Sequence, residues 1–494
     1  MTGAGTVELA LDGGDQLPTG WAWARLGDLG VWYGGGTPSK RRPEFWEDGT
    51  VPWLSPKDMG ADTIASTQDL IHSSALDASP VKLVPANSVA LVVRSGILER
   101  KVPIALVPFA TTLNQDMKAV SPFDGIDARW LAWALRARED YILANCRKRG
   151  TTVASLEVPW LMDMKLPVPP TAEQARIVAK LDEYVARIDA GEASTRVALA
   201  TSLLLAEQIA GQGALGGFVS ASDLTAHPLA NAGVSDGDLP DLPSDWSWVR
   251  LGEISEVVGG VTKDSKKQGD PSFVEVPYLR VANVQRGALK LDTVTTIRVP
   301  PAKAEALRLQ AGDVLLNEGG DRDKLGRGWI WEGQIADCIH QNHVFRARIR
   351  NERLHPKLLA WHANSFGKAW CDRNGSQVVN LASISLRKIK LLPVPLPPKD
   401  IQENLVKEIE VRLATAAAGE QLARDGFVRA VELRSSLLAT ALAGQLVPQD
   451  PTDEPAATVL ARIGAAQSAA AAAKSKRTLR PRKSTAPDQG EFPL

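Results

Sequence analysis

The sequence repeats itself once, at the scale of a whole domain. LPTGWAWARLG at 17–27 returns as LPSDWSWVRLG at 242–252, 225 positions later. At a similar offset VPWL (51–54) meets VPYL (276–279), and MKLPVPPTAEQARIV (164–178) meets IKLLPVPLPPKDIQENLV (389–406). So long a period excludes a short-period solenoid. We therefore predict two copies of one unit of roughly 200 residues.

Composition sets wider bounds. A chain of 494 residues is too long for one ordinary core. Its 57 basic and 57 acidic side chains cancel, which argues against a uniformly basic nucleic-acid binder but leaves room for local basic patches. Three distant cysteines do not make a disulfide framework and suggest a reducing, cytoplasmic location. Neither a membrane-spanning apolar run nor an export signal is evident.

Each unit has the same predicted order of parts. Short β-like runs alternate with helical stretches, a pattern typical of an α+β domain, until a proline-rich hinge. A long helix follows each hinge. The predicted division is a disordered tail at 1–16, a domain at 17–170, a central helix at 171–217, a linker at 218–241, a second domain at 242–398, a second helix at 399–447 and a disordered basic tail at 448–494.

The two long helices carry apolar residues at alternating spacings of three and four. Such a seam favours pairing of the helices with each other, and packing of each on its own domain is the alternative. Thr171 is a predicted N-cap, with Gln174 completing a capping box. About five extra residues in the second helix, including Gly426, predict a helix pair that is slightly asymmetric or locally broken. The pairing residues are Ile177, Leu181, Tyr184, Ile188, Val406, Ile409, Leu413, Phe427 and Leu437.

Several phrases, taken in order inside this doubled frame, resemble one known family. They include GGTPSKRRPEFWEDGTVPWLSPKDM (35–59), VPYLRVANVQRGAL (276–289), AGDVLLNEGGDRDKLGRG (311–328), CIHQNHVFRARI (338–349) and NLASISLRKIKLLPVPLPP (380–398). The chain is similar to the DNA-specificity subunit of type I restriction–modification systems over about 17–447. LVVRSGILERKVPIAL (91–106) keeps only part of the family's usual phrase.

That resemblance implies a fold and a set of partners. Two similar α/β target-recognition domains would be separated by two long antiparallel coiled-coil helices, with a pseudo-twofold internal repeat. Each domain would read one half of a bipartite, asymmetric DNA target. Two methyltransferase subunits and restriction/translocase subunits would supply the catalysis, using S-adenosylmethionine, ATP and Mg²⁺. This subunit would hold no cofactor or metal.

Reading a base edge requires planar donors and acceptors: Arg or Lys for guanine and Asn or Gln for adenine. Many such residues would contact phosphates or solvent instead, and the pairs at 114–115 and 341–342 are alternatively buried turn formers. In the first unit the candidates are Thr37, Lys40, Arg41, Arg42, Arg94, Arg100, Lys101, Asn114, Gln115, Arg147, Lys148 and Arg149. In the second they are Lys263, Lys266, Lys267, Arg280, Asn283, Gln285, Arg286, Arg322, Lys324, Arg327, Gln341, Asn342, Arg373, Asn374 and Gln377.

The alternative is a stand-alone site-specific nuclease or methyltransferase. Asp241 and Asp264-Ser265-Lys266 imitate a nuclease metal site, but they fall in a linker and a loop. Cys338, His340, His343 and Cys371 imitate a zinc site that the first unit lacks. Neither a P-loop nor an adenine-methylation phrase is present. We therefore predict a non-catalytic chain whose repeated tryptophans (21, 23, 246 and 248) anchor the core.

Overall fold

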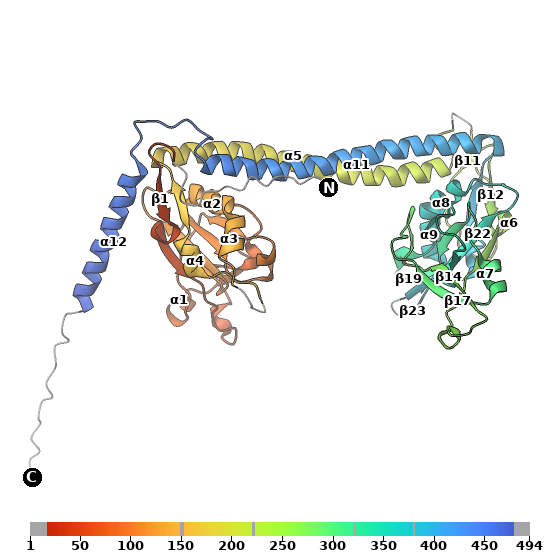
Figure 1. Cartoon of the computed structure of the whole chain (residues 1–494), viewed down its shortest axis with the longest axis horizontal. Helices are drawn as coiled ribbons and strands as arrows, with labels where there is room; N and C mark the ends of the chain where they lie inside the picture. Colours follow the sequence, from red (N-terminus) through yellow and green to blue (C-terminus); the bar gives the residue numbers. More distant parts are fainter. Residues whose placement is uncertain (1–16, 149–152, 220–222, 321, 379–380, 479–494) are drawn as a thin grey trace, which may run out of the picture. The chain divides into compact units, whose positions relative to one another are not determined.

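The computed structural model describes residues 17–148, 153–219, 223–320, 322–378 and 381–478. They form two compact units, and each unit takes a part of each long helix. Unit 1 joins the residues up to Ala193 with those from Val428 onward, and unit 2 is Ser194–Phe427. Figure 1 shows each unit as a mixed body of strands and short helices attached to long helical segments. The predicted tail at 1–16 lies outside the described residues.

Unit 1 is built on three small sheets. The largest has the order β2-β8-β5-β6 and is antiparallel throughout. A second has the order β4-β3-β7, in which β3 and β7 run parallel, and β1 pairs with β9. The strands are β1 (Ala22–Arg25), β2 (Gly30–Gly34), β3 (Val51–Leu54), β4 (Asp69–Ile71), β5 (Ser88–Val92), β6 (Ile104–Val107), β7 (Thr112–Leu113), β8 (Met117–Pro122) and β9 (Lys165–Val168).

Unit 2 repeats this topology strand for strand. The orders β13-β22-β18-β20 and β17-β14-β21 and the pair β12-β25 match those of unit 1, including the parallel pairing of β14 with β21. These strands are β12 (Ser247–Arg250), β13 (Ser255–Gly259), β14 (Val274–Leu279), β17 (Thr295–Val299), β18 (Val314–Asn317), β20 (Gly328–Ile330), β21 (Ile339–His340), β22 (Val344–Ile349) and β25 (Pro393–Leu396). The predicted doubled α+β architecture is therefore confirmed.

Unit 2 also has strands without counterparts in the first. They form the pairs β10-β11 and β15-β16 and the sheet β19-β24-β23. At the place of that last sheet, the described residues of unit 1 form two isolated bridges, Arg94 with Ser155 and Arg147 with Leu156. The added strands are β10 (Leu224–Thr225), β11 (Leu242–Pro243), β15 (Val284–Gln285), β16 (Ala288–Leu289), β19 (Gly319–Gly320), β23 (Ser376–Val378) and β24 (Leu381–Ser383).

Short helices cover the sheets, and a consecutive helix pair is central to each core. Five consecutive residues of α2, Leu131–Leu135, are buried in unit 1, and all six residues from Leu358 to Ala363 in α8 are buried in unit 2. Trp21, Trp246 and Trp248 are also buried, whereas Trp23 is half-buried. The short helices are α1 (Ser74–Ala78), α2 (Ala128–Ala137), α3 (Glu139–Asn145), α4 (Val158–Asp163), α6 (Leu251–Ile254), α7 (Pro301–Leu307), α8 (Pro356–Asn364), α9 (Phe366–Asn374) and α10 (Leu386–Ile389).

The long helices α5 (Thr171–Ala214) and α11 (Lys399–Leu442) are 44 residues each. The prediction of five extra residues and a break in the second helix is therefore wrong. Gly216 and Gly444 follow the two helices 228 positions apart, both with positive φ, so the offset never changes along the helices. The apparent insertion arose because a short apolar run in each helix was matched by its similar sequence, although the two runs do not lie at equivalent positions of the two helices.

Contacts within each unit show that the helices run antiparallel. In unit 1, Arg434 of α11 pairs with Asp189 of α5. In unit 2, a Cβ on Gly426 would lie 3.0 Å from Thr195 and one on Gly213 would lie 2.5 Å from Ile409. Of the predicted pairing residues, Ile177, Leu181, Ile188, Val406 and Ile409 are buried, Tyr184, Leu413 and Leu437 are half-buried, and Phe427 is exposed. Val185, which was not predicted, is buried as well.

The helix ends also join the domain cores. Ile177 and Leu181 belong to the core cluster of unit 1, together with Trp130 of α2 and Leu438 of α11. Val406 and Ile409 belong to the corresponding cluster of unit 2. Each long helix therefore packs on the core of a unit and also contacts the other long helix, so the two alternatives are compatible.

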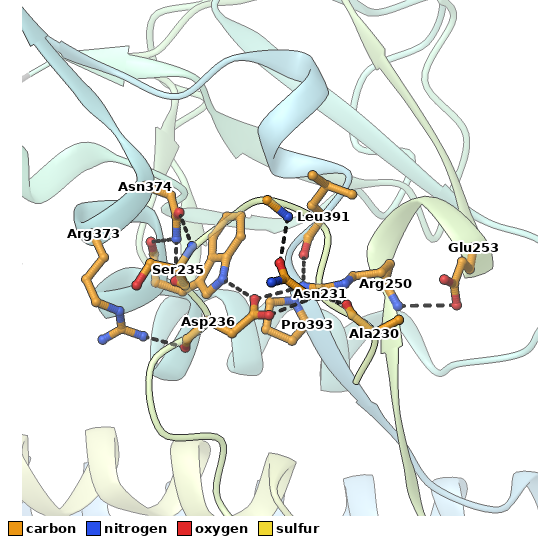
Figure 2. Close-up of polar contacts among 12 residues, drawn as sticks. Ala230, Asn231, Ser235, Asp236, Arg250, Glu253, Arg373, Asn374, Leu391 and Pro393 are labelled. Atoms are coloured by element: carbon orange, nitrogen blue, oxygen red, sulfur yellow. Dashed lines mark hydrogen bonds and ion pairs between the residues drawn. The ribbon is translucent and has the colours of Figure 1, made fainter. Parts of the chain in front are cut away.

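The predicted linker at 218–241 is part of unit 2 where it is described, and Figure 2 shows how its residues around Ser235 and Asp236 are held. The Asp236 carboxylate accepts two hydrogen bonds from Arg250, at 2.7 and 2.8 Å, and one from Trp370 Nε1 at 2.9 Å. Asn374 holds both the amide and the carbonyl of Ser235. Burial opposes the charge on Asp236, but the bonds from Arg250 and Trp370 outweigh it and lower the pKa of this carboxyl. The small polar residues of this segment are typical of a linker. The segment is instead anchored by the ion pair between Asp236 and the buried Arg250, which composition does not reveal.

The prediction of disorder from 448 onward is wrong for 456–478, which form α12 (Ala456–Thr478). The backbone nitrogen of Ala456 donates to the Gly20 carbonyl at 2.8 Å, and Val459 and Ile463 are buried in the core of unit 1. Alanine has the highest helix propensity, and the apolar spacing 456, 459, 460, 463 forms one helical stripe. Residues 479–494 lie outside the described residues. In the described part of the chain, no helix is both long and apolar enough to span a bilayer.

Candidate nucleic-acid interface

Three chain segments of unit 1 converge where its two main sheets meet. The Gly36 amide, just after β2, donates to the Leu113 carbonyl of β7 at 2.8 Å. The Val93 amide, just after β5, donates to the Asp116 carbonyl at 2.8 Å. A Cβ on Gly35 would lie 1.7 Å from the Asn114 carbonyl oxygen, so only glycine allows this approach. The loop 114–116 is therefore held from two sides.

Unit 2 repeats this convergence at the loop 341–343. Val261 donates to the His340 carbonyl at 2.9 Å, and Glu318 donates to the His343 carbonyl at 2.9 Å. Gly260 takes the place of Gly35, because its Cβ would lie 1.9 Å from the His340 carbonyl oxygen. The two loops are equivalent, and both contain predicted base-reading residues.

Polar side chains of unit 1 gather on its loop. Thr37 donates its hydroxyl hydrogen to Gln115 Oε1. Gln115 Nε2 donates to Asp116 Oδ2 at 3.1 Å, and Asn114 Oδ1 accepts from the Asp116 amide at 2.8 Å. Asn114 is half-buried and shapes the turn, whereas Gln115 is exposed. The structure thus brings the predicted residues Thr37, Asn114 and Gln115 together.

A different polar chain gathers on the loop of unit 2. His343 Nδ1 lies 2.6 Å from Glu318 Oε2, and Asn342 Nδ2 lies 3.3 Å from His343 Nε2. Gln341 and Asn342 are half-buried and His343 is exposed. Neither Glu318 nor His343 was predicted as a DNA contact. Their sequence signal is weak, because Glu and His are not among the amide and basic residue types that the base-reading prediction uses.

Basic residues of unit 1 lie on segments joined to this loop. Ser95, which follows exposed Arg94, donates its backbone amide to the Ala154 carbonyl at 3.0 Å, and Lys148 donates to Ser155 at 2.8 Å. Arg147 forms an ion pair with Glu99 at 3.2 Å, and the Lys148 ammonium lies 3.7 Å from Glu157. Arg100 and Lys101 are exposed at the end of the 3₁₀ helix η4 (Gly96–Glu99), and Arg149 lies outside the described residues.

Lys40, Arg41 and Arg42 are exposed on a separate loop. The Arg42 guanidinium pairs with Glu44 at 2.7 Å and lies 4.2 Å from the centre of the Phe45 ring. Trp53 Nε1 donates to the Gly36 carbonyl at 3.0 Å, which ties the start of this loop to the convergence point. Among the described residues, Lys40 and Arg41 form no ion pair, unlike Arg42.

In unit 2 the predicted residues have varied environments. Lys263 and Lys266 are exposed, and the side chains of Lys267 and Gln377 lie outside the described part of the chain. Arg322 is exposed and pairs with Asp372, whereas Arg280, Lys324 and Arg327 are half-buried. Gln285 donates to the Ala282 carbonyl at 2.6 Å and Arg286 to the Asn364 carbonyl at 2.6 Å. The last two side chains thus support local structure.

For two residues of unit 2 the prediction of base contact is wrong. Asn283 is 2% exposed and donates to the carbonyls of Lys290 and Thr293. Asn374 is 6% exposed and binds Ser235, while its neighbour Arg373 donates to the Asp236 carbonyl at 2.9 Å. Buried amides with satisfied partners are unavailable to a base edge. Composition alone does not separate a turn-forming Asn from a base-reading one.

The suspected zinc ligands do not gather. Cys338 and Cys371 lie in different core clusters, and the His340 imidazole bonds the Val344 carbonyl at 2.6 Å. Burial raises the pKa of both thiols to about 12 and lowers the pKa of His340 to about 4. No cluster of three or more potential metal ligands occurs among the described residues. Asp264, from the suspected nuclease site, accepts from the Lys266 amide at 3.1 Å and thereby caps the 3₁₀ helix η5 (Ser265–Lys267).

Comparisons with known proteins match this architecture. A family model of the type I restriction modification DNA specificity domain matches residues 18–196. The EcoR124I/EcoR124II specificity subunit of Escherichia coli is 48% identical over 162 residues, which cover 33% of this chain and 40% of that subunit. The EcoDI specificity subunit of Escherichia coli is 22% identical over 487 residues, covering 94% of this chain and 98% of that subunit.

Solved structures share the fold. A chain from a structure concerned with complex assembly and conformational transition of the type I R-M system has a TM-score of 0.65 at 18% identity, covering 87% of this chain and 100% of its own. The HsdS subunit from Thermoanaerobacter tengcongensis has a TM-score of 0.53 at 18% identity, covering 88% of this chain and 99% of its own. One unit of this chain, residues 18–196, thus matches the type I restriction modification DNA specificity domain, and the topology of that unit is repeated in the other.

Proposed function

We propose that this chain selects the DNA sequence on which a type I restriction–modification complex acts. Each unit would read one half of a bipartite target in double-stranded DNA. The observation that carries the proposal is one topology present twice, with different polar side chains on equivalent loops. Because the loops at 114–116 and 341–343 differ, the two half-sites are expected to differ, which makes the target asymmetric.

The chemistry would belong to partner subunits. Two methyltransferase subunits would modify adenine with S-adenosylmethionine, and restriction/translocase subunits would use ATP and Mg²⁺. The polar groups described above serve local structure or lie on exposed loops, an arrangement that suits binding better than catalysis. A complex assembled without this chain is therefore expected to lack sequence selection.

The long helices would set the gap between the half-sites. Each is continuous for 44 residues, about 66 Å at 1.5 Å per residue. Equivalent positions on one face of B-DNA recur about every 34–36 Å. Removing the same number of helical turns from both helices should shorten the gap and leave both half-sites unchanged. A changed half-site would argue against this role.

The function is tested by exchanging residues 30–160 for the segment of another family member. The complex is assembled with its methyltransferase subunits, and methylated adenines are mapped on genomic DNA. We expect one half of the methylated sequence to change and the other half to remain. If both halves stay the same, unit 1 does not read DNA.

The competing function is a stand-alone nuclease or methyltransferase. The purified chain is incubated with DNA and either Mg²⁺ or S-adenosylmethionine, without partners. We expect neither cleavage nor methyl transfer. Turnover by the chain alone would favour the enzyme.

A further inference from the structure

The two units present a side-chain amide at the same place. Gln115 is the second residue after β7, and Asn342 is the second residue after β21. The preceding residues, Asn114 and Gln341, donate their backbone amides to Leu54 and Leu279, both at 2.8 Å. Gln115 and Asn342 therefore occupy equivalent structural positions. They are 227 positions apart in the sequence, whereas the repeat begins with an offset of 225.

In unit 1 this amide is braced at both atoms. Its oxygen accepts from Thr37, and its nitrogen donates to Asp116 at 3.1 Å. An amide oxygen has two lone pairs and an amide nitrogen carries two hydrogens. The bracing therefore uses one site on each atom. It leaves one acceptor and one donor, side by side, on an exposed residue.

In unit 2 a longer chain does the bracing. His343 Nδ1 lies 2.6 Å from the Glu318 carboxylate, and in the tautomer with its proton on Nδ1 the ring accepts at Nε2 from Asn342 Nδ2 at 3.3 Å. As in Gln115, the amide oxygen and the second amide hydrogen of Asn342 are left side by side as one acceptor and one donor. Glu318 and His343 thus act through Asn342.

The shared fold does not need these polar side chains. Val93 of unit 1 occupies the position of Glu318: their amides donate to Asp116 and His343, and their carbonyls accept from Leu156 and Ile384, each at 2.8–2.9 Å. Val93 is buried and apolar. The turn in unit 1 is closed by Asn114 rather than by Gln115. The fold therefore does not explain why these amides are braced, which leaves a role in function as the explanation.

We propose that Gln115 and Asn342 are equivalent base-reading amides that each recognise an adenine. The remaining acceptor suits adenine N6–H and the remaining donor suits N7, the bidentate contact that distinguishes adenine in the major groove. Thr37 and the Glu318–His343 pair are positioning residues that fix the amide plane. This inference rests on the proposed function and names the element of each unit that reads a base.

The test uses the full chain with its methyltransferase subunits and a library of duplexes randomised across both half-sites. Gln115→Leu should reduce the preference for adenine at one position of one half-site by about 5- to 150-fold, the range for one bidentate contact. Asn342→Leu should do the same in the other half-site. Gln68→Leu and Gln334→Leu, which alter exposed amides elsewhere in the same units, should change neither.

The positioning residues have separate tests. Glu318→Val inserts the side chain found in unit 1, so the fold should accept it, and adenine preference should fall only in the second half-site. Glu318→Gln still offers an oxygen to the His343 proton and should restore it. In the same way Thr37→Val should weaken the first half-site, and Thr37→Ser should not.

The outcomes separate this inference from the proposed function. A wild-type complex with no sequence preference would defeat the proposed function. A wild-type preference that survives both Leu variants, or that concerns a base other than adenine, would defeat the inference alone. A uniform loss of affinity across all sequences would assign these residues to backbone contact or folding, and would also overturn it. In each variant the unmutated half-site reports whether the protein is intact.

Discussion

At the residue scale, one buried glutamine joins each long helix to its unit. Gln174 accepts from the Asp127 amide at 2.7 Å and donates to the carbonyls of Pro169 and Gly125 at 3.0 and 3.2 Å. Gln402 makes the same three bonds to His355, Pro397 and Arg353, at 2.7, 3.0 and 3.0 Å. The sequence placed Gln174 in a capping box of its own helix. The structure instead shows it holding the first residue before α2, a contact that no local pattern reveals.

Replacing either glutamine should destabilise its unit. Gln174→Ala or Gln402→Ala leaves one buried and two partly buried backbone groups without this partner, so the free energy of unfolding should fall by about 2–4 kcal/mol. Urea denaturation followed by tryptophan fluorescence measures the change. Gln421→Ala removes an exposed amide of α11 that bonds only Asp425 in the described contacts, and should cost less than about 0.5 kcal/mol. Equal effects in all three variants would contradict the buried role.

At the element scale, the sequence predicted the existence of the long helices better than their details. Proline hinges and apolar spacing located their starts at Thr171 and Lys399, and the structure begins both helices there. The ends were predicted too late, at 217 and 447, because the apolar pattern continues past the glycines that stop each helix at Gly216 and Gly444. The five extra residues expected in the second helix were likewise wrong, because only the continuous backbone shows that the offset stays constant along both helices.

Two glycines of α5 should respond oppositely to alanine. Among the described residues, no atom outside the helix lies within 4 Å of a Cβ on Gly191, whereas a Cβ on Gly213 would lie 2.5 Å from Ile409. Gly191→Ala should therefore stabilise the protein by about 0.5–1 kcal/mol through helix propensity. Gly213→Ala should destabilise it by about 1–3 kcal/mol through overpacking. Thermal unfolding of the two variants checks the signs, and stabilisation by both would show that the helices do not pack closely there.

At the scale of the whole molecule, repetition in the sequence predicted the doubled fold, but not what distinguishes the two units. The parallel pairing of β3 with β7 joins residues about sixty positions apart, which alternation along a strand does not specify. The bracing around Gln115 and Asn342 depends on three segments meeting, so the sequence offered those amides only among many candidates. The docked α12 and the Asp236 anchor were hidden in stretches whose composition resembles that of a linker.

The units also differ in buried histidines, and this asymmetry predicts which unit acid unfolds first. In unit 2 burial lowers the pKa of His340 and His362 to about 4, from an ordinary value of 6.5. Between pH 6.5 and about 4 these histidines are protonated in the unfolded state but not in the folded state. The free energy of unfolding therefore falls as the pH falls. Each histidine contributes about 1.4 kcal/mol per pH unit within that window.

Unit 1 has only His72, which is half-buried, and its buried carboxyls act in the opposite direction. Burial raises the pKa of Glu139 and Glu173, so each favours the folded state as the pH falls toward the ordinary value of 4.5. Hydrogen-exchange mass spectrometry after incubation between pH 7 and pH 4 should therefore show β18 and β22 losing protection before β5 and β8. His362→Gln keeps a donor for the Pro393 carbonyl and removes the titrating ring, so it should reduce this difference. If β5 and β8 lose protection first, buried charge does not control the acid stability of either unit.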